Sequence, residues 1–402
     1  MKTEIITNDI ASAAEIISRG GLVAVPTETV YGLAGNGLNE EAVKEIYSVK
    51  GRPEVKALSL MVPDKEAMNE YCEDVPAAAY ALAEKFWPGP LTIILKSKDC
   101  VPALVRAGGS TIGLRCPDHS LTLRLLKECA LPLAAPSANP SGEPSPKNAA
   151  KVLEYFDGKI DGVLDGGECG IGTESTIIDM SQSPYRILRR GALADEEISR
   201  ALADSLTLVG ITGGSGCGKT TALKVLEKMG GLVVDADEVY HCLCAESEEM
   251  RRELTARFGE VYKDGKLDRK ALGAIVFADT EALKDLNKIT HKYVSEEMQR
   301  RLERHAMNGG TLAAIDAIAL LEGAFAKRTA FNVAVTAPTE DRVQRLLMRE
   351  GISEEYARSR IAAQRPNEYF SENCDYTLHN GGTREEFECV CNKFFAEVLK
   401  NV

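Results

Sequence analysis

The 402-residue sequence has no uninterrupted apolar run of the roughly 18 residues that a membrane-spanning helix requires. Its first ten residues, MKTEIITNDI, lack the apolar core of a secretory signal peptide. Low-complexity tracts and internal repeats are also missing. These absences argue against an integral membrane protein and a repeat architecture, so we expect a cytoplasmic protein with no membrane partner.

An excess of positive charge is lacking too. The chain carries 48 Lys and Arg against 60 Asp and Glu, for a formal net charge of −12. Stable binding along a nucleic acid is therefore not expected, because such binding depends on many Lys and Arg that neutralise phosphates. A local basic cleft for one anionic nucleotide remains compatible with this charge.

Paired cysteines are missing as well. The eleven cysteines are scattered and form no CxxC pair, and the closest spacings, Cys242 with Cys244 and Cys389 with Cys391, are too tight for a usual zinc site. We expect reduced thiols in an intracellular protein.

The sequence does contain enough apolar residues for two hydrophobic cores. The chain has 402 residues, of which 44% are hydrophobic, and a single core rarely grows that large, so we expect two domains of roughly 200 residues. The pattern changes after the charged helical stretch 192–203, where a new buried strand begins at 206. We expect a first domain at 1–195, a linker at 196–205 and a second domain at 206–402.

Both halves read as α/β. The first mixes short apolar strands with helices and has Pro- and Gly-rich loops, which predicts a mixed, twisted α/β domain. The second alternates strands with helices, which predicts a parallel sheet covered on both faces.

The segment GGSGCGKT at 213–220 matches the phosphate-loop pattern GxxxxGK[ST], with an apolar strand before it and a helical pattern after it. Backbone N–H groups and the helix N-terminus of such a loop bind phosphate oxygens. The pattern predicts that Lys219 bridges the β- and γ-phosphates of ATP and that Thr220 holds Mg²⁺. The expected ATP-binding residues are Ser215, Gly216, Cys217, Gly218, Lys219 and Thr220.

Two acids follow the next strand, at Asp235 and Asp237. The carboxyl ends of parallel strands line the ligand crevice, so these acids suit Mg²⁺ positioning or deprotonation of a substrate hydroxyl. Either acid could instead cap the helix that begins near Glu238, and the two roles can coexist.

The order of motifs in this half resembles dephospho-CoA kinase over essentially all of 206–402: TGGSGCGKTT, VVDAD, DRKALGAIVF, DAIALLE, RVQRLLMREGISEEYARSRIAAQ and CDYTLHNGG. The resemblance implies that ATP phosphorylates the ribose 3′-hydroxyl of dephospho-CoA, with Asp237 as general base. It places Arg345 and Arg349 in a mobile lid helix, where at least one is expected to stabilise the transferring phosphoryl group.

In the first half, hydroxyls and cations recur where strands give way to loops, in PTETVYG at 26–32, KGRP at 50–53, GLRCPDH at 113–119, PSANPSG at 136–142 and LRRG at 188–191. From the residues alone, each segment taken singly is better explained as a turn-rich loop or a solvated helix end. Together the segments indicate only an anion- or nucleotide-binding α/β domain.

Taken as an ordered set covering about 1–195, these motifs resemble the YrdC-like threonylcarbamoyl-AMP synthases. The resemblance implies condensation of L-threonine, bicarbonate and ATP, with a product that serves tRNA-modifying proteins downstream. It assigns threonine contacts to Thr29, Arg115 and Ser175. It assigns ATP contacts, including one supporting side chain at Asn139, to Arg52, Lys56, Thr111, Ser137, Asn139, Ser145 and Arg189.

Two alternatives stay open. The first half could bind RNA or a nucleotide without catalysis, and the second could phosphorylate another small hydroxyl substrate, such as a nucleoside monophosphate. The resemblance favours a bifunctional enzyme that uses ATP with Mg²⁺.

Overall fold

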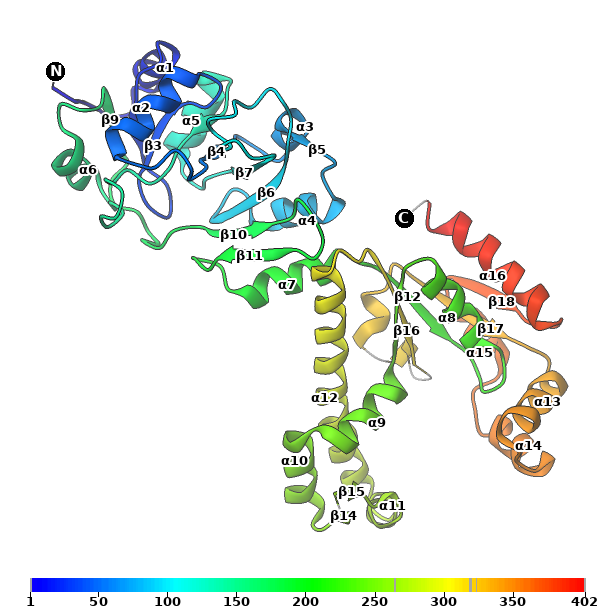
Figure 1. Ribbon diagram of the computed structural model, residues 1–402. Helices are drawn as coiled ribbons and strands as arrows, with labels where there is room; N and C mark the ends of the chain where they lie inside the picture. The colour runs from blue at the N-terminus through cyan, green and yellow to red at the C-terminus, as the bar shows by residue number, and fades with distance from the viewer. Residues whose placement is uncertain (1, 264, 318–319, 323, 401–402) are drawn as a thin grey trace. The chain divides into compact units, whose positions relative to one another are not determined.

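The computed structural model describes residues 2–263, 265–317, 320–322 and 324–400 (Figure 1). Positions 318–319 of the DAIALLE motif lie outside the described residues. The chain divides into two compact units, Met1–Asp204 with Met307–Gly309, and Ser205–Ala306 with Gly310–Val402. The charged stretch after 195 is helix α7 (Asp195–Asp204), which belongs to the first unit and buries Ile198, Ala201 and Leu202.

The first unit contains a mixed sheet in the strand order β1-β9-β2-β3-β8-β4-β7-β6-β10-β11, with β5 paired to β6. Its strands are β1 (Glu4–Ile6), β2 (Val23–Val25), β3 (Gly32–Asn36), β4 (Ser59–Met61), β5 (Cys72–Glu73), β6 (Leu91–Ser97), β7 (Thr111–Arg115), β8 (Leu133–Ala134), β9 (Gly162–Leu164), β10 (Thr176–Asp179) and β11 (Arg186–Arg189). Its other helices are α1 (Ile10–Ser18), α2 (Glu40–Lys50), α3 (Ala67–Tyr71), α4 (Ala77–Phe86), α5 (Ser120–Cys129) and α6 (Ala149–Phe156).

Helix α2 shows how local sequence sets the ends of these elements. The side chain of Asn39 accepts hydrogen bonds from the first-turn N–H groups of Glu41 and Ala42, and Gly51 ends the helix in a left-handed conformation. The helix end therefore lies just before Arg52, and the KGRP segment turns towards the sheet.

The second unit contains a five-stranded sheet in the order β13-β16-β12-β17-β18, and every pairing in it is parallel. This confirms the predicted parallel α/β fold. The strands are β12 (Thr207–Thr212), β13 (Leu232–Asp235), β16 (Leu312–Asp316), β17 (Phe331–Thr336) and β18 (Tyr376–His379), and a separate hairpin pairs β14 (Tyr262–Lys263) with β15 (Lys266–Leu267).

The helices that follow β12 along the chain are α8 (Lys219–Lys228), α9 (Ala236–Glu246), α10 (Glu248–Phe258), α11 (Arg269–Val276), α12 (Thr280–Met307), α13 (Thr339–Glu350), α14 (Glu354–Ala362), α15 (Asn367–Glu372) and α16 (Arg384–Val398). Two short 3₁₀ helices, η1 (Leu320–Glu322) and η2 (Ala324–Lys327), precede β17.

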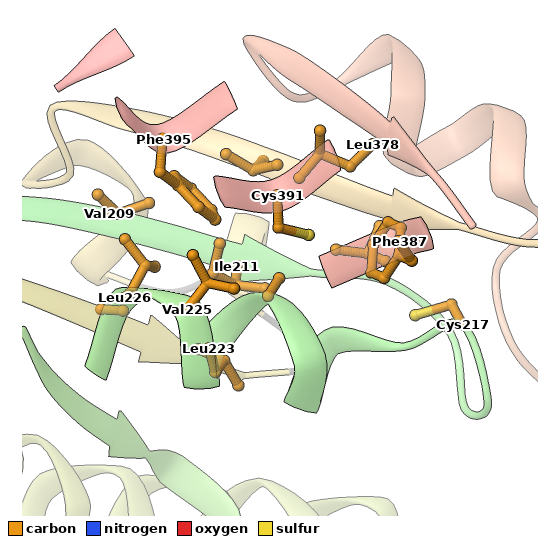
Figure 2. Packing of buried hydrophobic residues seen from close by; sticks show 14 of the residues in the cluster. Val209, Ile211, Cys217, Leu223, Val225, Leu226, Leu378, Phe387, Cys391 and Phe395 are labelled. Atoms are coloured by element: carbon orange, nitrogen blue, oxygen red, sulfur yellow. The ribbon is translucent and has the colours of Figure 1, made fainter. Parts of the chain in front are cut away.

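The core of this sheet lies between β12 and helices α8 and α16 (Figure 2). Val209 and Ile211 of β12 face Leu226 of α8 and Phe395 of α16, and all four side chains are buried. Because α8 begins directly at the phosphate loop, this packing fixes the direction of the helix that follows the loop.

The cysteines follow the expectation of free thiols, since all eleven are unpaired in the described structure. Within the described residues, no helix is long and apolar enough to cross a membrane.

Candidate active sites

The phosphate loop of the second unit connects the end of β12 to the start of α8. Gly213 has a φ of 143°, and a Cβ there would lie 2.2 Å from the carbonyl oxygen of Val335. Gly218 has a φ of 109°, and a Cβ there would lie 2.2 Å from Asn380 Nδ2. Both positions therefore require glycine, because a side chain would meet both a disfavoured φ and a neighbouring atom.

A cavity of about 490 Å³ opens beside this loop. It brings together most of the residues that the sequence predicts for the kinase site: Ser215, Gly216, Gly218, Lys219, Thr220, Asp237, Arg345 and Arg349. Cys217 differs, because its side chain is buried in the core cluster beside Phe387 (Figure 2). Cys217 therefore does not line the cavity, and its N–H donates to the carbonyl oxygen of Gly214 at 3.3 Å.

Three carboxylates line the same cavity, at Asp235, Asp237 and Asp316. Asp235 is the helix cap, since its Oδ1 accepts from the N–H groups of Asp237 at 2.8 Å and Glu238 at 3.1 Å. Asp237 lies in the first turn of α9, so its side chain is not the cap. The capping role considered for this pair therefore belongs to Asp235, and both carboxylates line the cavity.

Asp316 is an acid of this cavity that the sequence analysis did not single out. It ends β16, which lies between β12 and β13 and pairs Asp316 with both Ile211 and Asp235. Lys219 Nζ lies 3.8 Å from Asp316 Oδ1 and donates to the carbonyl oxygen of Gly213 at 3.2 Å. Burial, opposed by Lys219, raises the pKa of Asp316 to about 6. The sequence feature that could have indicated Asp316 as a site residue is an acid at the end of the apolar run LAAID.

The two predicted arginines lie on α13 but make different contacts. Arg345 donates to the carbonyl oxygen of Gly216 at 3.3 Å and to Asn380 Oδ1 at 3.1 Å, so its guanidinium already touches the phosphate loop. Arg349 pairs with Glu350 and is more exposed. The cavity is also lined by two arginines that the sequence analysis did not predict, Arg360 of α14 and Arg384 of α16.

In the first unit, a cavity of about 350 Å³ lies over one face of the sheet. Residues two apart on a strand share a face, and the cavity is lined by Ser59 and Met61 of β4, Thr92 and Ile94 of β6, and Thr111, Gly113 and Arg115 of β7. Six of the residues predicted from the resemblance meet there: Arg52, Thr111, Arg115, Ser137, Ser175 and Arg189.

Arg115 is held in a buried ion pair. Its Nη2 lies 2.8 Å from Glu28 Oε1 and 2.8 Å from Thr29 Oγ1, and its Nε donates to the carbonyl oxygen of Gly89 at 3.3 Å. Thr29 is fully buried, and its contact with Arg115 lies behind the cavity lining. Of the three residues that the resemblance assigns to the substrate threonine, Thr29 and Arg115 therefore form one hydrogen-bonded group, and Ser175 is a separate contact.

Two of the residues assigned to ATP, Ser145 and Arg189, meet at Glu174, an acid that the sequence analysis passed over. Its carboxylate pairs with Arg189 and accepts from Ser145 Oγ at 3.0 Å. Arg189 also donates from Nη2 to Ser175 Oγ at 3.0 Å, and Ser175 Oγ lies 2.9 Å from Thr92 Oγ1. Residues assigned to ATP and to threonine are thus joined through one guanidinium.

Lys50 supports the loop that carries Ser137 and Asn139. Its buried ammonium donates to the backbone carbonyl oxygens of both residues, and burial together with the charge of Arg52 lowers the pKa of Lys50 to about 8. Lys50 is the first residue of the KGRP motif, so this motif is the sequence feature that could have indicated its role. Asn139 Nδ2 closes the same loop onto Glu143 O at 2.6 Å, whereas Lys56 is exposed beside the cavity.

Comparisons with known proteins match each half separately. The Sua5–YciO–YrdC family model, described as "Telomere recombination", matches residues 15–191, and the model described as "Dephospho-CoA kinase" matches residues 207–386. The dephospho-CoA kinase of Corynebacterium glutamicum is 35% identical over 196 residues, which cover 48% of this chain and 98% of that protein.

The threonylcarbamoyl-AMP synthase of Pyrococcus abyssi is 45% identical over 195 residues, which cover 48% of this chain and 57% of that protein. The chain therefore spans little more than half the length of the synthases that it matches. A solved structure titled "Crystal structure of P. abyssi Sua5 complexed with L-threonine" is 28% identical, with a TM-score of 0.49 over 78% of this chain and 92% of that one. Through its second half the chain belongs to the dephospho-CoA kinase family, and its first half contains a Sua5/YrdC-type domain.

Proposed function

We propose that the chain is a bifunctional enzyme with two separate ATP sites. The second unit phosphorylates the ribose 3′-hydroxyl of dephospho-CoA, and the first forms threonylcarbamoyl-AMP from L-threonine, bicarbonate and ATP. The observation that carries the kinase half is that Asp237 lines the same cavity as Lys219 and the phosphate loop.

In the kinase reaction, Asp237 accepts the proton of the 3′-hydroxyl as its oxygen attacks the γ-phosphorus of ATP. The bond from the γ-phosphorus to the β–γ bridging oxygen breaks, and ADP leaves. Lys219 and the loop N–H groups hold the phosphates, while Arg345 and Arg349 face the charge that develops on the transferring group. Asp237 is the one proton acceptor that this scheme uses, and most of the rate enhancement is assigned to positioning and charge.

The oxygen donors of this cavity fit a magnesium ion. Thr220 offers a hydroxyl and Asp235, Asp237 and Asp316 offer carboxylates, which are the ligand types that Mg²⁺ prefers. Burial is the main cause of the raised pKa of Asp316, and the negative charges of Asp235 and Asp237 raise it further against the opposing effect of Lys219. When bound with ATP, Mg²⁺ neutralises phosphate charge, and Thr220 together with Asp316 is proposed to hold it.

In the synthase reaction, the amine of threonine condenses with bicarbonate to give a carbamate and water. A carbamate oxygen then attacks the α-phosphorus of ATP, the bond from the α-phosphorus to the α–β bridging oxygen breaks, and pyrophosphate leaves. Arg115 and Ser175 are proposed to hold threonine. Arg52, Ser137 and Arg189 are proposed to hold the phosphates, with Lys56 approaching from the rim. A site of hydroxyls and guanidinium groups suits this chemistry, which requires alignment and charge stabilisation more than a nucleophilic side chain.

The product would pass to tRNA-modifying proteins, and we propose a cytoplasmic location, where both sets of substrates occur. Independence of the two sites is tested with Lys219→Ala in the full chain. We expect loss of ADP and CoA formation, with pyrophosphate release that still requires both threonine and bicarbonate.

Lys228→Ala is the matched control, because Lys228 ends the same helix and forms an exposed pair with Glu388. It should retain both activities. Loss of both activities in Lys219→Ala would contradict independent sites. A wild-type chain that forms ADP with a nucleoside monophosphate but not with dephospho-CoA would favour the other kinase substrate. tRNA binding without pyrophosphate release would favour a non-catalytic first unit.

A further inference from the structure

Ser215 of the phosphate loop is held by hydrogen bonds from the helical hairpin α13–α14. Ser215 donates its N–H to Gln364 Oε1 at 2.9 Å, and its Oγ accepts from Gln364 Nε2 at 2.8 Å. Its carbonyl oxygen accepts from Arg342 Nε at 2.9 Å. All three polar atoms of Ser215 are therefore bound by side chains of the hairpin.

The two partners come from opposite ends of the hairpin. Arg342 lies in the first turns of α13, and Gln364 follows the end of α14. Arg342 Nη2 also donates to Gln364 Oε1 at 2.9 Å, so the two side chains and Ser215 form a closed set of hydrogen bonds. The motif RVQRLLMREGISEEYARSRIAAQ begins and ends with these two residues.

This junction is buried and closely packed. The Arg342 side chain is 3% exposed, and a Cβ added at Gly214 would lie 2.3 Å from its Nη2. The acceptors of Arg342 among the described residues are neutral oxygens, so its positive charge stays beside the phosphate loop without an acidic partner there. Behind the junction, Val343, Leu346, Ala357 and Ile361 pack α13 against α14.

Arg345 extends the same interface by one turn. It lies three residues after Arg342, so both side chains point from one face of α13 towards the loop. Arg342 holds Ser215, and Arg345 reaches Gly216. The orientation of Arg345 therefore depends on whether the hairpin is held at Ser215.

We propose that Arg342 and Gln364 are positioning residues that join the hairpin to Ser215, so that phosphate binding in the loop and alignment of Arg345 occur together. This proposal rests on the proposed kinase function of the second unit. A nucleotide that orders the phosphate loop then also orders the hairpin, because Ser215 belongs to both. Gln364 and Arg342 act through other groups and do not touch the substrate.

The test is Gln364→Ala in the full chain, with two measurements. First, kcat for dephospho-CoA phosphorylation should fall by about 10- to 100-fold, with KM for dephospho-CoA changed by less than about threefold, because Arg345 is misaligned in the transition state. Second, backbone hydrogen exchange over 339–364 should slow when the wild type binds the non-hydrolysable analogue AMP-PNP with Mg²⁺. That protection should be lost in Gln364→Ala.

Gln364→Glu should keep the protection, because its carboxylate accepts from Arg342 and from the Ser215 N–H, and the Ser215 hydroxyl can turn to donate to it. Arg358→Ala is the matched control, since it removes an exposed contact of α14 with Glu340 of α13 that does not involve the loop. It should leave kcat and protection unchanged.

Should Gln364→Ala fail to fold, Ser215→Ala removes one of the four hydrogen bonds and should shift both measurements in the same direction by less. A kcat within about threefold of the wild type, or undiminished protection by AMP-PNP, overturns the proposal. If the wild type does not phosphorylate dephospho-CoA, the proposed function fails, while the exchange measurement still tests the junction.

Discussion

Asp316→Asn should stabilise the second unit while impairing its activity. Burial raises the pKa of Asp316 from an ordinary value of 3.8 to about 6, and its side chain is 15% exposed. At neutral pH the folded state therefore contains mostly the ionised acid, at a cost of up to about 3 kcal/mol of stability. Asparagine resembles the neutral acid in shape and hydrogen bonding, so it removes this penalty.

The sign of the effect sets its pH dependence. A folded-state pKa above the unfolded value gives stability that is fully present below about pH 4 and is lost as pH rises through 6. The variant should match the wild type near pH 4 and exceed it by up to about 3 kcal/mol at pH 8, which corresponds to about 6 to 12 °C for a unit of this size. Kinase activity should fall, because a proposed Mg²⁺ ligand is lost.

The assay uses the full chain without nucleotide or divalent cations. The single tryptophan, Trp87, lies in the first unit, so its fluorescence follows that unit alone. Circular dichroism follows both units, and the transition without a fluorescence change belongs to the second. The control is Asp279→Asn. Asp279 is exposed and accepts a hydrogen bond from Glu281 N–H at the start of α12, and asparagine can cap the helix in the same way. A gap of equal size at pH 4 and pH 8, or a less stable Asp316→Asn at pH 8, would refute the reasoning.

Two further predictions concern the first unit. Arg115→Ala leaves Glu28 buried without its ion-pair partner, so the free energy of unfolding of the first unit, measured in urea by Trp87 fluorescence, should fall by about 3 kcal/mol. Pyrophosphate release by this variant should no longer respond to threonine. An unchanged unfolding midpoint would contradict the predicted loss of stability. For Lys50, whose pKa is lowered from 10.5 to about 8, the folded state releases its proton first. Stability should therefore rise by up to about 3 kcal/mol between pH 8 and 10.5, and Lys50→Gln should lack that rise; equal slopes in both proteins would count against it.

Much of the fold could be predicted from local patterns. The strand that begins near 206 and the helix after the phosphate loop appear where the apolar run and the loop pattern placed them, as β12 (Thr207–Thr212) and α8 (Lys219–Lys228). The sequence did not predict β3, because Gly32–Asn36 reads GLAGN and contains few residues that favour strands. It forms a strand because its two neighbours, β2 and β8, supply partners on both sides.

The candidate sites divide in the same way. Gly213, Lys219 and Thr220 could be predicted, because their spacing along the chain is itself the binding geometry of a strand–loop–helix unit. Asp316 could not, because it joins the site only when β16 inserts between β12 and β13. Glu174 and Lys50 likewise act on partners 15 and 87 residues away in the chain.

The sequence alone determined the change of pattern near 206, the strand–loop–helix unit around Lys219 and the residue types at several strand ends, because these depend on neighbours along the chain. Strand order, register and the packing of distant segments were decided only by the tertiary structure. The tertiary structure determines which acid lies beside Lys219, which lysine is buried and which residues bind Ser215. Each of these three features depends on side chains brought together from separate elements.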